Sequence, residues 1–240
     1  MLANLEAVGV SRRFGWRWAL REVNFSLERG SRVALLGANG SGKTTLLRIL
    51  SGLLRPNKGE VLISGNPVST RDRARIGLLG HDPLMYPSLT LRENLEFFAR
   101  LFCLPEEVVA GRCERFAEVL GISERLNEPI NTLSQGLRQR AALARAMLHE
   151  PEFFLLDEPF AGLDQVAAAG LESILRDFSG EGRFEDGAPR SFLLTEHDIP
   201  RALSLSDKVV ILSKGEVVFR APSCETSVEM VSAALGGEGE

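Results

Sequence analysis

Apolar and polar positions alternate with two different periods along this chain of 240 residues. Short apolar or alternating runs predict strands, because every second residue of a strand faces the same side. Early in the chain such runs occupy Leu5–Val10, Val23–Leu27, Val33–Leu36 and Val61–Ser64. A helix-forming stretch lies between the third and fourth of these strands. It runs from Lys43 to Leu50 and should stop near Gly52.

The middle of the chain is predicted to be largely helical, from about Leu84 to Glu150. Thr90–Glu93 reads as a capping box, in which a threonine and a glutamate satisfy free backbone donors at a helix start. An apolar stripe at helical spacing follows, formed by Leu91, Leu95, Phe98 and Phe102. Most of this stripe should be ordinary core.

Alternation of strands and helices resumes after Glu150. Phe153–Leu156 and Ser191–Leu194 read as buried strands, and Val209–Leu212 and Val217–Phe219 form a hairpin turned by Lys214-Gly215. One face of an intervening helix carries Ala167, Leu171, Ile174, Leu175 and Phe178. The polar, glycine-containing stretch from Ser179 to Arg190 is predicted to be a loop, and a weakly helical tail ends the chain.

Composition narrows the possible partners and location. The 28 basic and 32 acidic residues give a net charge of −4, so no general attraction to nucleic acid is expected. No apolar run approaches the ~20 residues of a membrane-spanning helix, and the first eight residues do not resemble a signal peptide. We therefore expect a cytosolic chain with three reduced cysteines, and any membrane spans should come from another polypeptide.

The strongest chemical signal is a glycine-rich loop between the predicted strand Val33–Leu36 and the helix that follows it. The loop fits the phosphate-binding pattern G-x-x-x-x-G-K-[ST], with the residues Gly37, Ala38, Asn39, Gly40, Ser41, Gly42, Lys43 and Thr44. Backbone N–H groups and the helix N-terminus suit phosphates, Lys43 would reach the β- and γ-phosphates, and the Thr44 hydroxyl would ligate Mg²⁺. Thr45 follows the loop directly and is counted with it. A glycine-rich turn with a chance lysine is the alternative.

Two further blocks carry candidate chemistry. The strand Phe153–Leu156 runs into Asp157 and Glu158, which strand alternation points in different directions. Asp157 suits a water-mediated hold on Mg²⁺, and Glu158 suits polarisation of the water that attacks the γ-phosphate. Ser134 is a natural cap for the helix that follows it, and Gly136 permits close approach of another backbone. Alone, these blocks would read as an acidic turn and an ordinary cap.

In this order, the three blocks resemble the nucleotide-binding subunit of ATP-binding-cassette (ABC) proteins, over roughly Leu5 to Phe219. The resemblance implies one α/β domain over 1–240. This would be a P-loop NTPase of ABC type with a RecA-like core, an antiparallel β subdomain and an α-helical subdomain at about 84–150. Phe14 matches the aromatic residue that stacks on adenine, Ala161–Asp164 matches the D-loop, and His197 matches the switch histidine that contacts the γ-phosphate.

Two motifs of the chain depart from the family pattern. The usual signature L-S-G-G-Q is replaced by Leu133-Ser134-Gln135-Gly136-Leu137, which keeps the serine and the second glycine but loses the glutamine. His81 stands where the family usually has a glutamine that senses Mg²⁺ and the attacking water. Nitrogen is a poor ligand for this hard cation, so any contact of His81 with Mg²⁺ should run through a water. The polar stretch of 179–190 is also longer than the family usually has there.

The resemblance further implies a head-to-tail dimer that holds ATP and Mg²⁺ between the P-loop of one copy and the Ser134 helix of the other. The segment Gly80–Pro83, with Leu89–Leu101 after it, looks like the ATPase of the haem exporter of cytochrome c maturation. Integral membrane permease subunits would dock near His81 to Phe102, placing the chain on the inner face of the cell membrane. Three alternatives stay open: the ATPase of another exporter, a soluble ABC ATPase without a transport role, and a cassette that binds ATP without hydrolysing it.

Overall fold

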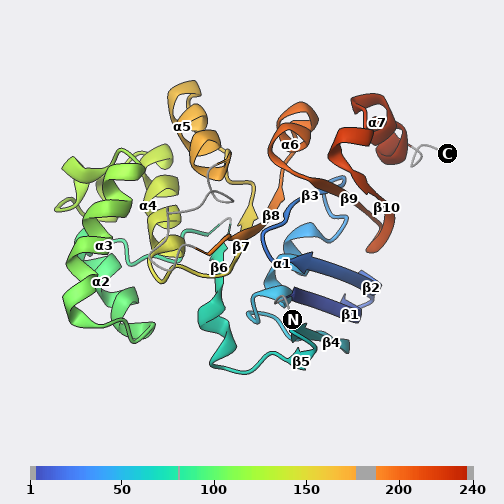
Figure 1. Cartoon of the computed structure of the whole chain (residues 1–240), viewed down its shortest axis with the longest axis horizontal. Helices are drawn as coiled ribbons and strands as arrows, with labels where there is room; N and C mark the ends of the chain where they lie inside the picture. Colours follow the sequence, from blue (N-terminus) through green and yellow to red (C-terminus); the bar gives the residue numbers. More distant parts are fainter. Residues whose placement is uncertain (1–3, 81, 177–187, 237–240) are drawn as a thin grey trace.

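Two β-sheets with helices packed around them form the fold (Figure 1). The computed structural model describes residues 4–80, 82–176 and 188–236. The smaller sheet has the strand order β2-β1-β4-β5, and the larger has the order β10-β9-β3-β8-β7-β6. Most of the sequence-predicted strands and helices are present, with the differences in bounds given below.

The smaller sheet is antiparallel throughout. Its strands are β1 Asn4–Phe14, β2 Arg17–Glu28, β4 Lys58–Ile63 and β5 Asn66–Pro67. Strands β1 and β2 are longer than the apolar pattern predicts. Their halves next to the β1–β2 turn are mostly exposed, carry arginines and contain register shifts, so no regular apolar pattern marks them as strand. Ser64 was predicted to be in a strand, which is wrong: it has a φ of 53° and opens the turn before β5.

The larger sheet is parallel except for the hairpin at its edge. Its strands are β3 Arg32–Leu36, β6 Ile76–Leu79, β7 Phe153–Asp157, β8 Ser191–Thr195, β9 Lys208–Ser213 and β10 Glu216–Pro222. The carboxyl ends of parallel strands meet at one edge of a sheet, where open α/β sheets bind ligands. Since β3, β8 and β7 are neighbours, the loops after these three strands must lie together. The β9–β10 hairpin is confirmed, with Lys214 and Gly215 both at positive φ as a type I′ turn requires.

Helix α1 Lys43–Leu50 packs between the two sheets, and three helices cover the other face of the larger sheet (Figure 1). Leu46, Leu47 and Leu50 of α1 are fully buried against both sheets. Full burial of such a side chain contributes about 1.5–3 kcal/mol, so α1 and the loop before it are fixed firmly in place. The three covering helices are α5 Gln165–Arg176, α6 Ile199–Leu205 and α7 Val228–Gly236.

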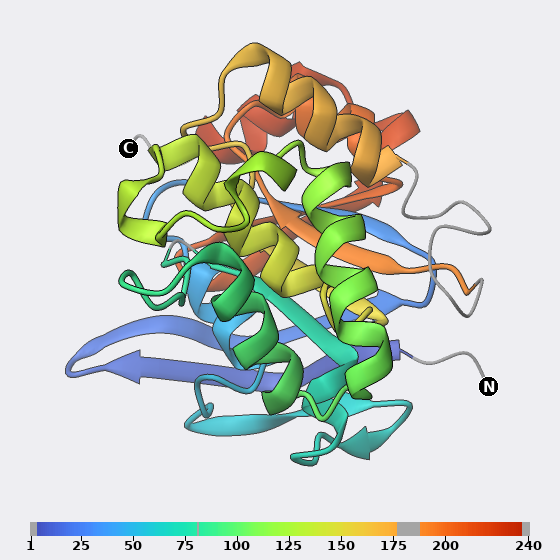
Figure 2. The same ribbon diagram turned by 90° about the vertical axis from the view of Figure 1, so that its left-hand side faces the viewer.

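A helical part stands to one side of the sheets and faces the viewer in Figure 2. It contains α2 Leu91–Leu101, α3 Glu106–Val119 and α4 Gln135–Met147. The capping box is confirmed: the Thr90 hydroxyl accepts from the Glu93 amide, and the Glu93 carboxylate accepts from the Thr90 amide at 2.7 Å. The first helix of this helical part, α2, begins at Leu91 and not at Leu84. The segment before the cap holds two prolines and forms turns instead of a helix.

Some expectations fall on residues outside the described ranges. These are His81, Phe178 and most of the predicted loop of 179–190. Within the ranges that the structure does describe, no helix combines the length and the apolar character that crossing a bilayer requires.

Candidate nucleotide site

The glycine-rich loop lies between β3 and α1, at the carboxyl edge of the larger sheet. Gly37 has a φ of 156° and Gly42 a φ of 112°, which non-glycine residues rarely adopt. A Cβ at Gly37 would lie 2.3 Å from the Leu212 carbonyl oxygen, and one at Gly42 would lie 2.4 Å from that of Ala19. Close packing against neighbouring backbone therefore requires glycine at both positions.

Helix α1 opens with backbone donors that the protein itself does not use. Its N-cap is Gly42, which has no side chain to cap the first turn. In the described structure, no acceptor pairs with the amides of Lys43, Thr44 and Thr45. Free amides at a helix N-terminus, together with the helix dipole, attract anions and phosphates in particular.

Lys43 is held inside the loop. Its side chain is only 6% exposed, and its Nζ donates to the carbonyl oxygens of Gly37 at 2.7 Å and Ala38 at 3.2 Å. Burial lowers the pKa of Lys43, while the nearby carboxylates of Glu158 and Asp157 act in the opposite direction. The ammonium thus sits in a poorly solvated place with two carbonyls as its partners, where an anionic ligand would bind it strongly.

A cleft of about 350 Å³ joins the loop to the other predicted residues, and this volume suits a small ligand. Its lining combines the predicted adenine-stacking aromatic residue, the loop and the carboxylate that the sequence predicts to be catalytic. The lining residues are Phe14, Arg17, Ala19, Asn39, Gly40, Gly42, Lys43, Thr44, Thr45 and Glu158. An aromatic side chain at one end and a lysine with free amides at the other fit a nucleoside phosphate.

Asp157 and Glu158 are positioned by the next strand of the sheet. The buried Thr195 hydroxyl donates to Asp157 Oδ1 at 2.8 Å and accepts from the Glu158 amide at 2.9 Å. Glu158 has a φ of 50°, a strained conformation that this hydrogen bond helps to hold. Asp157 is therefore fixed within the sheet edge, whereas the Glu158 carboxylate reaches the cleft.

His197 follows β8 and contacts the same carboxylate. Its Nε2 lies 2.9 Å from Glu158 Oε1. The turn that presents the ring is shaped by Glu196, whose Oε1 accepts from the amides of His197 at 2.7 Å and Asp198 at 3.1 Å. The structure thus places a base-like carboxylate near the lysine of the loop and an imidazole in contact with that carboxylate.

The signature segment lies elsewhere in the chain. Ser134 caps α4 by accepting from the Leu137 amide at 3.4 Å, and its own side chain is exposed. Neither Ser134 nor Gly136 lines the loop cleft, and α4 stands apart from α1 (Figure 1). Gln135 comes closer to the chemistry, since it lines a second cleft together with Asp157 and Glu158. One copy of the chain therefore does not place its signature serine on its own phosphate loop.

The donors available for a metal are few. In the described ranges, no cluster of three or more His, Cys, Asp or Glu side chains could hold an ion. Mg²⁺ usually keeps several waters and takes one or two carboxylates together with phosphate oxygens. The Thr44 hydroxyl in the cleft and Asp157 at the sheet edge fit that mode of binding. His81, the third predicted contact, lies outside the described residues.

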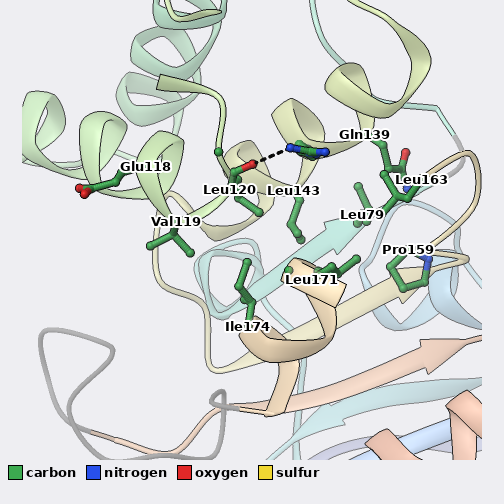
Figure 3. A pocket seen from close by; sticks show the side chains of 13 residues that line it. Leu79, Glu118, Val119, Leu120, Gln139, Leu143, Pro159, Leu163, Leu171 and Ile174 are labelled. Carbon is green, nitrogen blue, oxygen red and sulfur yellow. Dashed lines mark hydrogen bonds between the residues drawn. The ribbon is translucent and has the colours of Figure 1, made fainter. Parts of the chain in front are cut away.

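A separate, more apolar cavity lies between the helical part and α5 (Figure 3). Leu79, Leu120, Leu143, Leu171 and Ile174 contribute much of its lining. Leu163 of the predicted D-loop lines it, but none of the residues predicted to bind phosphate or Mg²⁺ does.

Sequence reasoning missed two residues of the site. Arg17 lines the cleft, and its only signal was its place in the aromatic and arginine-rich run Ser11–Trp18. Thr195 joins Asp157 to Glu158, but nothing in the local sequence distinguishes it from other strand-end threonines.

Comparison with known proteins extends this picture. The family model described as ABC transporter matches residues 20–161, more than half of the chain. The ABC transporter ATP-binding protein NatA of Bacillus subtilis is 33% identical over 207 residues, covering 84% of this chain and 81% of the relative. The sulfate/thiosulfate import protein CysA of Synechococcus elongatus is 36% identical, covering 87% of this chain. The Nod factor export ATP-binding protein I of Ralstonia nicotianae is 31% identical, covering 89%. The chain spans only 59% and 65% of these last two relatives.

Solved structures agree with the fold. A dimeric, post-hydrolysis structure of the ATP-binding cassette MJ0796 bound to ADP and Pi superimposes with a TM-score of 0.81, at 27% identity. The match covers 91% of this chain and 98% of that one. The cbiO1 subunit of Clostridium perfringens matches with a TM-score of 0.77 over 98% of this chain. The predicted ABC-type fold is confirmed, and the chain is an ATP-hydrolysing, ATP-binding subunit that belongs to the ABC transporter family.

Proposed function

We propose that the chain is the ATPase of a membrane exporter, of the type that exports haem for cytochrome c maturation. The observation that carries the ATPase role is the cleft that joins Phe14, the phosphate loop and Glu158. The exporter branch is supported by the sequence segment Gly80–Pro83 and the helix start after it. The relatives named above include both importers and exporters, and they support the broader role of transport.

Each group of residues in and around the cleft is proposed to hold one part of the nucleotide. Phe14 stacks on adenine, the loop residues Gly37–Thr45 hold the phosphates, and Lys43 neutralises the β- and γ-phosphates. Thr44 would hold Mg²⁺ directly, and Asp157 and His81 would each hold it through a water. When bound, Mg²⁺ would supply positive charge that offsets the charge of the phosphates.

Glu158 and His197 act on the attacking water and the γ-phosphate. The Glu158 carboxylate accepts the proton of the water, as a positioned general base does. His197 holds that carboxylate at 2.9 Å, and in its second role donates to the γ-phosphate. Since His197 is exposed and Glu158 lines the cleft, a ligand can reach both groups.

A second copy of the chain completes the site. Ser134 and Gly136 begin a 13-residue helix whose exposed N-terminus has partial positive charge. Placed head to tail, the α4 start of one copy would face the phosphate loop of the other, so that ATP joins the two. The dimeric form of the similar MJ0796 cassette supports this arrangement.

Membrane subunits would bind the surface between Pro83 and Phe102. Two of its apolar side chains are strongly exposed: Leu84 is 43% and Leu101 is 61% accessible. Tyr86 of the same segment is also exposed and packs edge-on against Phe97, with their ring centroids 4.9 Å apart. Partners bound here would keep the chain at the cytoplasmic face of the cell membrane.

The test is affinity purification of the full chain from detergent-solubilised membranes, with mass spectrometry of what it captures. We expect integral membrane subunits, whose identity decides the haem-exporter branch. The double variant Leu84→Glu/Leu101→Glu should lose them and keep ATP binding. Val218→Glu, on exposed β10, is the matched control and should keep them. Capture of ribosomes, nucleic acid or no membrane protein would refute the export role.

A further inference from the structure

Arg17 lies at the tip of the β1–β2 hairpin, directly across from the aromatic residue proposed to stack on adenine. The backbone register pairs Phe14 with Arg17. Both side chains line the cleft that also contains Gly40 and Lys43. A Cβ placed on Gly40 would lie 3.3 Å from Arg17 Nη2, so the guanidinium reaches the phosphate loop itself.

Other arginines of the same hairpin have partners within the protein. Arg12 packs on the Phe14 ring at 4.8 Å and donates to the Arg55 carbonyl oxygen at 3.0 Å, while Arg13 lies over the Trp18 ring. Arg17 differs: within the described residues, its guanidinium has neither a carboxylate nor another hydrogen-bond acceptor. An exposed cation with all its donors free stands at the wall of a phosphate-binding cleft.

We propose that Arg17 is a second cationic ligand of the bound nucleotide and contacts its phosphate chain. The planar guanidinium offers paired donors that match phosphate oxygens, which a lysine does not. Because Arg17 stands across from Phe14, it serves the phosphates nearest the nucleoside. It therefore recognises nucleoside di- and triphosphates alike, and it contributes to retention of ADP as well as binding of ATP.

This role rests on the nucleotide assignment proposed above, and the experiment separates the two. Fluorescent ATP and ADP analogues are titrated into the full chain with Mg²⁺ at low and moderate salt. The variants are Arg17→Gln, Arg17→Lys, Lys43→Ala and Arg21→Gln. Arg21 is the matched control, because it is also an exposed arginine of β2 and it lines a different groove.

Arg17→Gln should weaken ATP and ADP by the same factor, about tenfold, as loss of one exposed charge-assisted contact predicts. Adenosine, used as a competitor without phosphates, should bind Arg17→Gln and wild type equally. Arg17→Lys should recover part of the lost nucleotide affinity. The affinity of Arg17→Gln should depend less steeply on salt concentration than that of the wild type. Arg21→Gln should bind like wild type.

Two results would overturn the role of Arg17. One is an affinity of Arg17→Gln within twofold of wild type while Lys43→Ala loses binding. The other is an equal loss in Arg21→Gln, which would show a general charge effect. Unchanged binding by Lys43→Ala would instead refute the assignment of the cleft.

Discussion

The Thr195 hydroxyl contacts both acidic residues of the site, so its removal should lower the stability of the fold. It donates to Asp157 Oδ1 at 2.8 Å and accepts from the Glu158 amide at 2.9 Å, and its residue is fully buried. Thr195→Val keeps the shape of the side chain but leaves both groups without this partner. Valine therefore tests the hydrogen bonds with little change in packing.

The two lost hydrogen bonds set the expected loss in the free energy of unfolding. A bond to a charged acceptor contributes about 1.5–3 kcal/mol and a neutral one about 0.5–1.5 kcal/mol, which together give roughly 2–4 kcal/mol. For a chain of this size each kcal/mol shifts the melting temperature by about 2–4 °C, so we expect a decrease of roughly 5–15 °C. ATP hydrolysis should also decrease, because Glu158 loses the contact that holds its backbone.

The assay is thermal unfolding followed by circular dichroism without nucleotide, together with a steady-state ATPase measurement. Thr195→Ser is the control, since it keeps the hydroxyl and loses only one methyl group, worth about 0.8 kcal/mol. The serine variant should lie close to wild type in both measurements. A valine variant as stable as wild type, or a serine variant as damaged as valine, would refute the reasoning.

Three further predictions concern single residues. Lys43→Ala should lose at least tenfold in ATP affinity, measured by titration with labelled ATP, because it removes a buried cation facing phosphates. Burial lowers the pKa of His149 to about 4 from 6.5. Between these two pH values His149 takes up a proton in the unfolded chain but not in the folded chain. The free energy of unfolding should therefore fall by about 3 kcal/mol as the pH drops from 6.5 to 4. Urea unfolding should show His149→Gln with a flatter pH profile. Burial raises the pKa of Cys113 to about 11, so Ellman's reagent at pH 8 should titrate the exposed Cys103 and Cys224 quickly and Cys113 only after unfolding.

Much of the fold could be predicted because its signals are local. The helix of Lys43–Leu50 was predicted with the bounds that the structure shows, since a loop glycine precedes it and Gly52 follows its end. Strand β6 was missed, because four residues with an internal glycine show no periodicity. It forms by pairing with β7, a contact between residues far apart in the chain.

The site was only partly predictable for the same reason. The phosphate loop and the acidic pair are contiguous motifs, so their positions follow from the sequence. Thr195 and Arg17 acquire their places from strand neighbours, and sheet order cannot be obtained from one sequence. The contact between Glu158 and His197 likewise depends on β7 lying next to β8.

The central claim is that two copies of this chain close on ATP and that hydrolysis by Glu158 separates them. The most direct measurement is light scattering of Glu158→Gln during size-exclusion chromatography with Mg-ATP. We expect a species of twice the protomer mass, because the variant keeps the size of the side chain and loses its basic carboxylate. Adding Ser134→Glu, which places a negative charge toward the phosphates across the interface, should return the chain to a monomer. A Glu158→Gln protein that stays monomeric and hydrolyses ATP at the wild-type rate would contradict the claim.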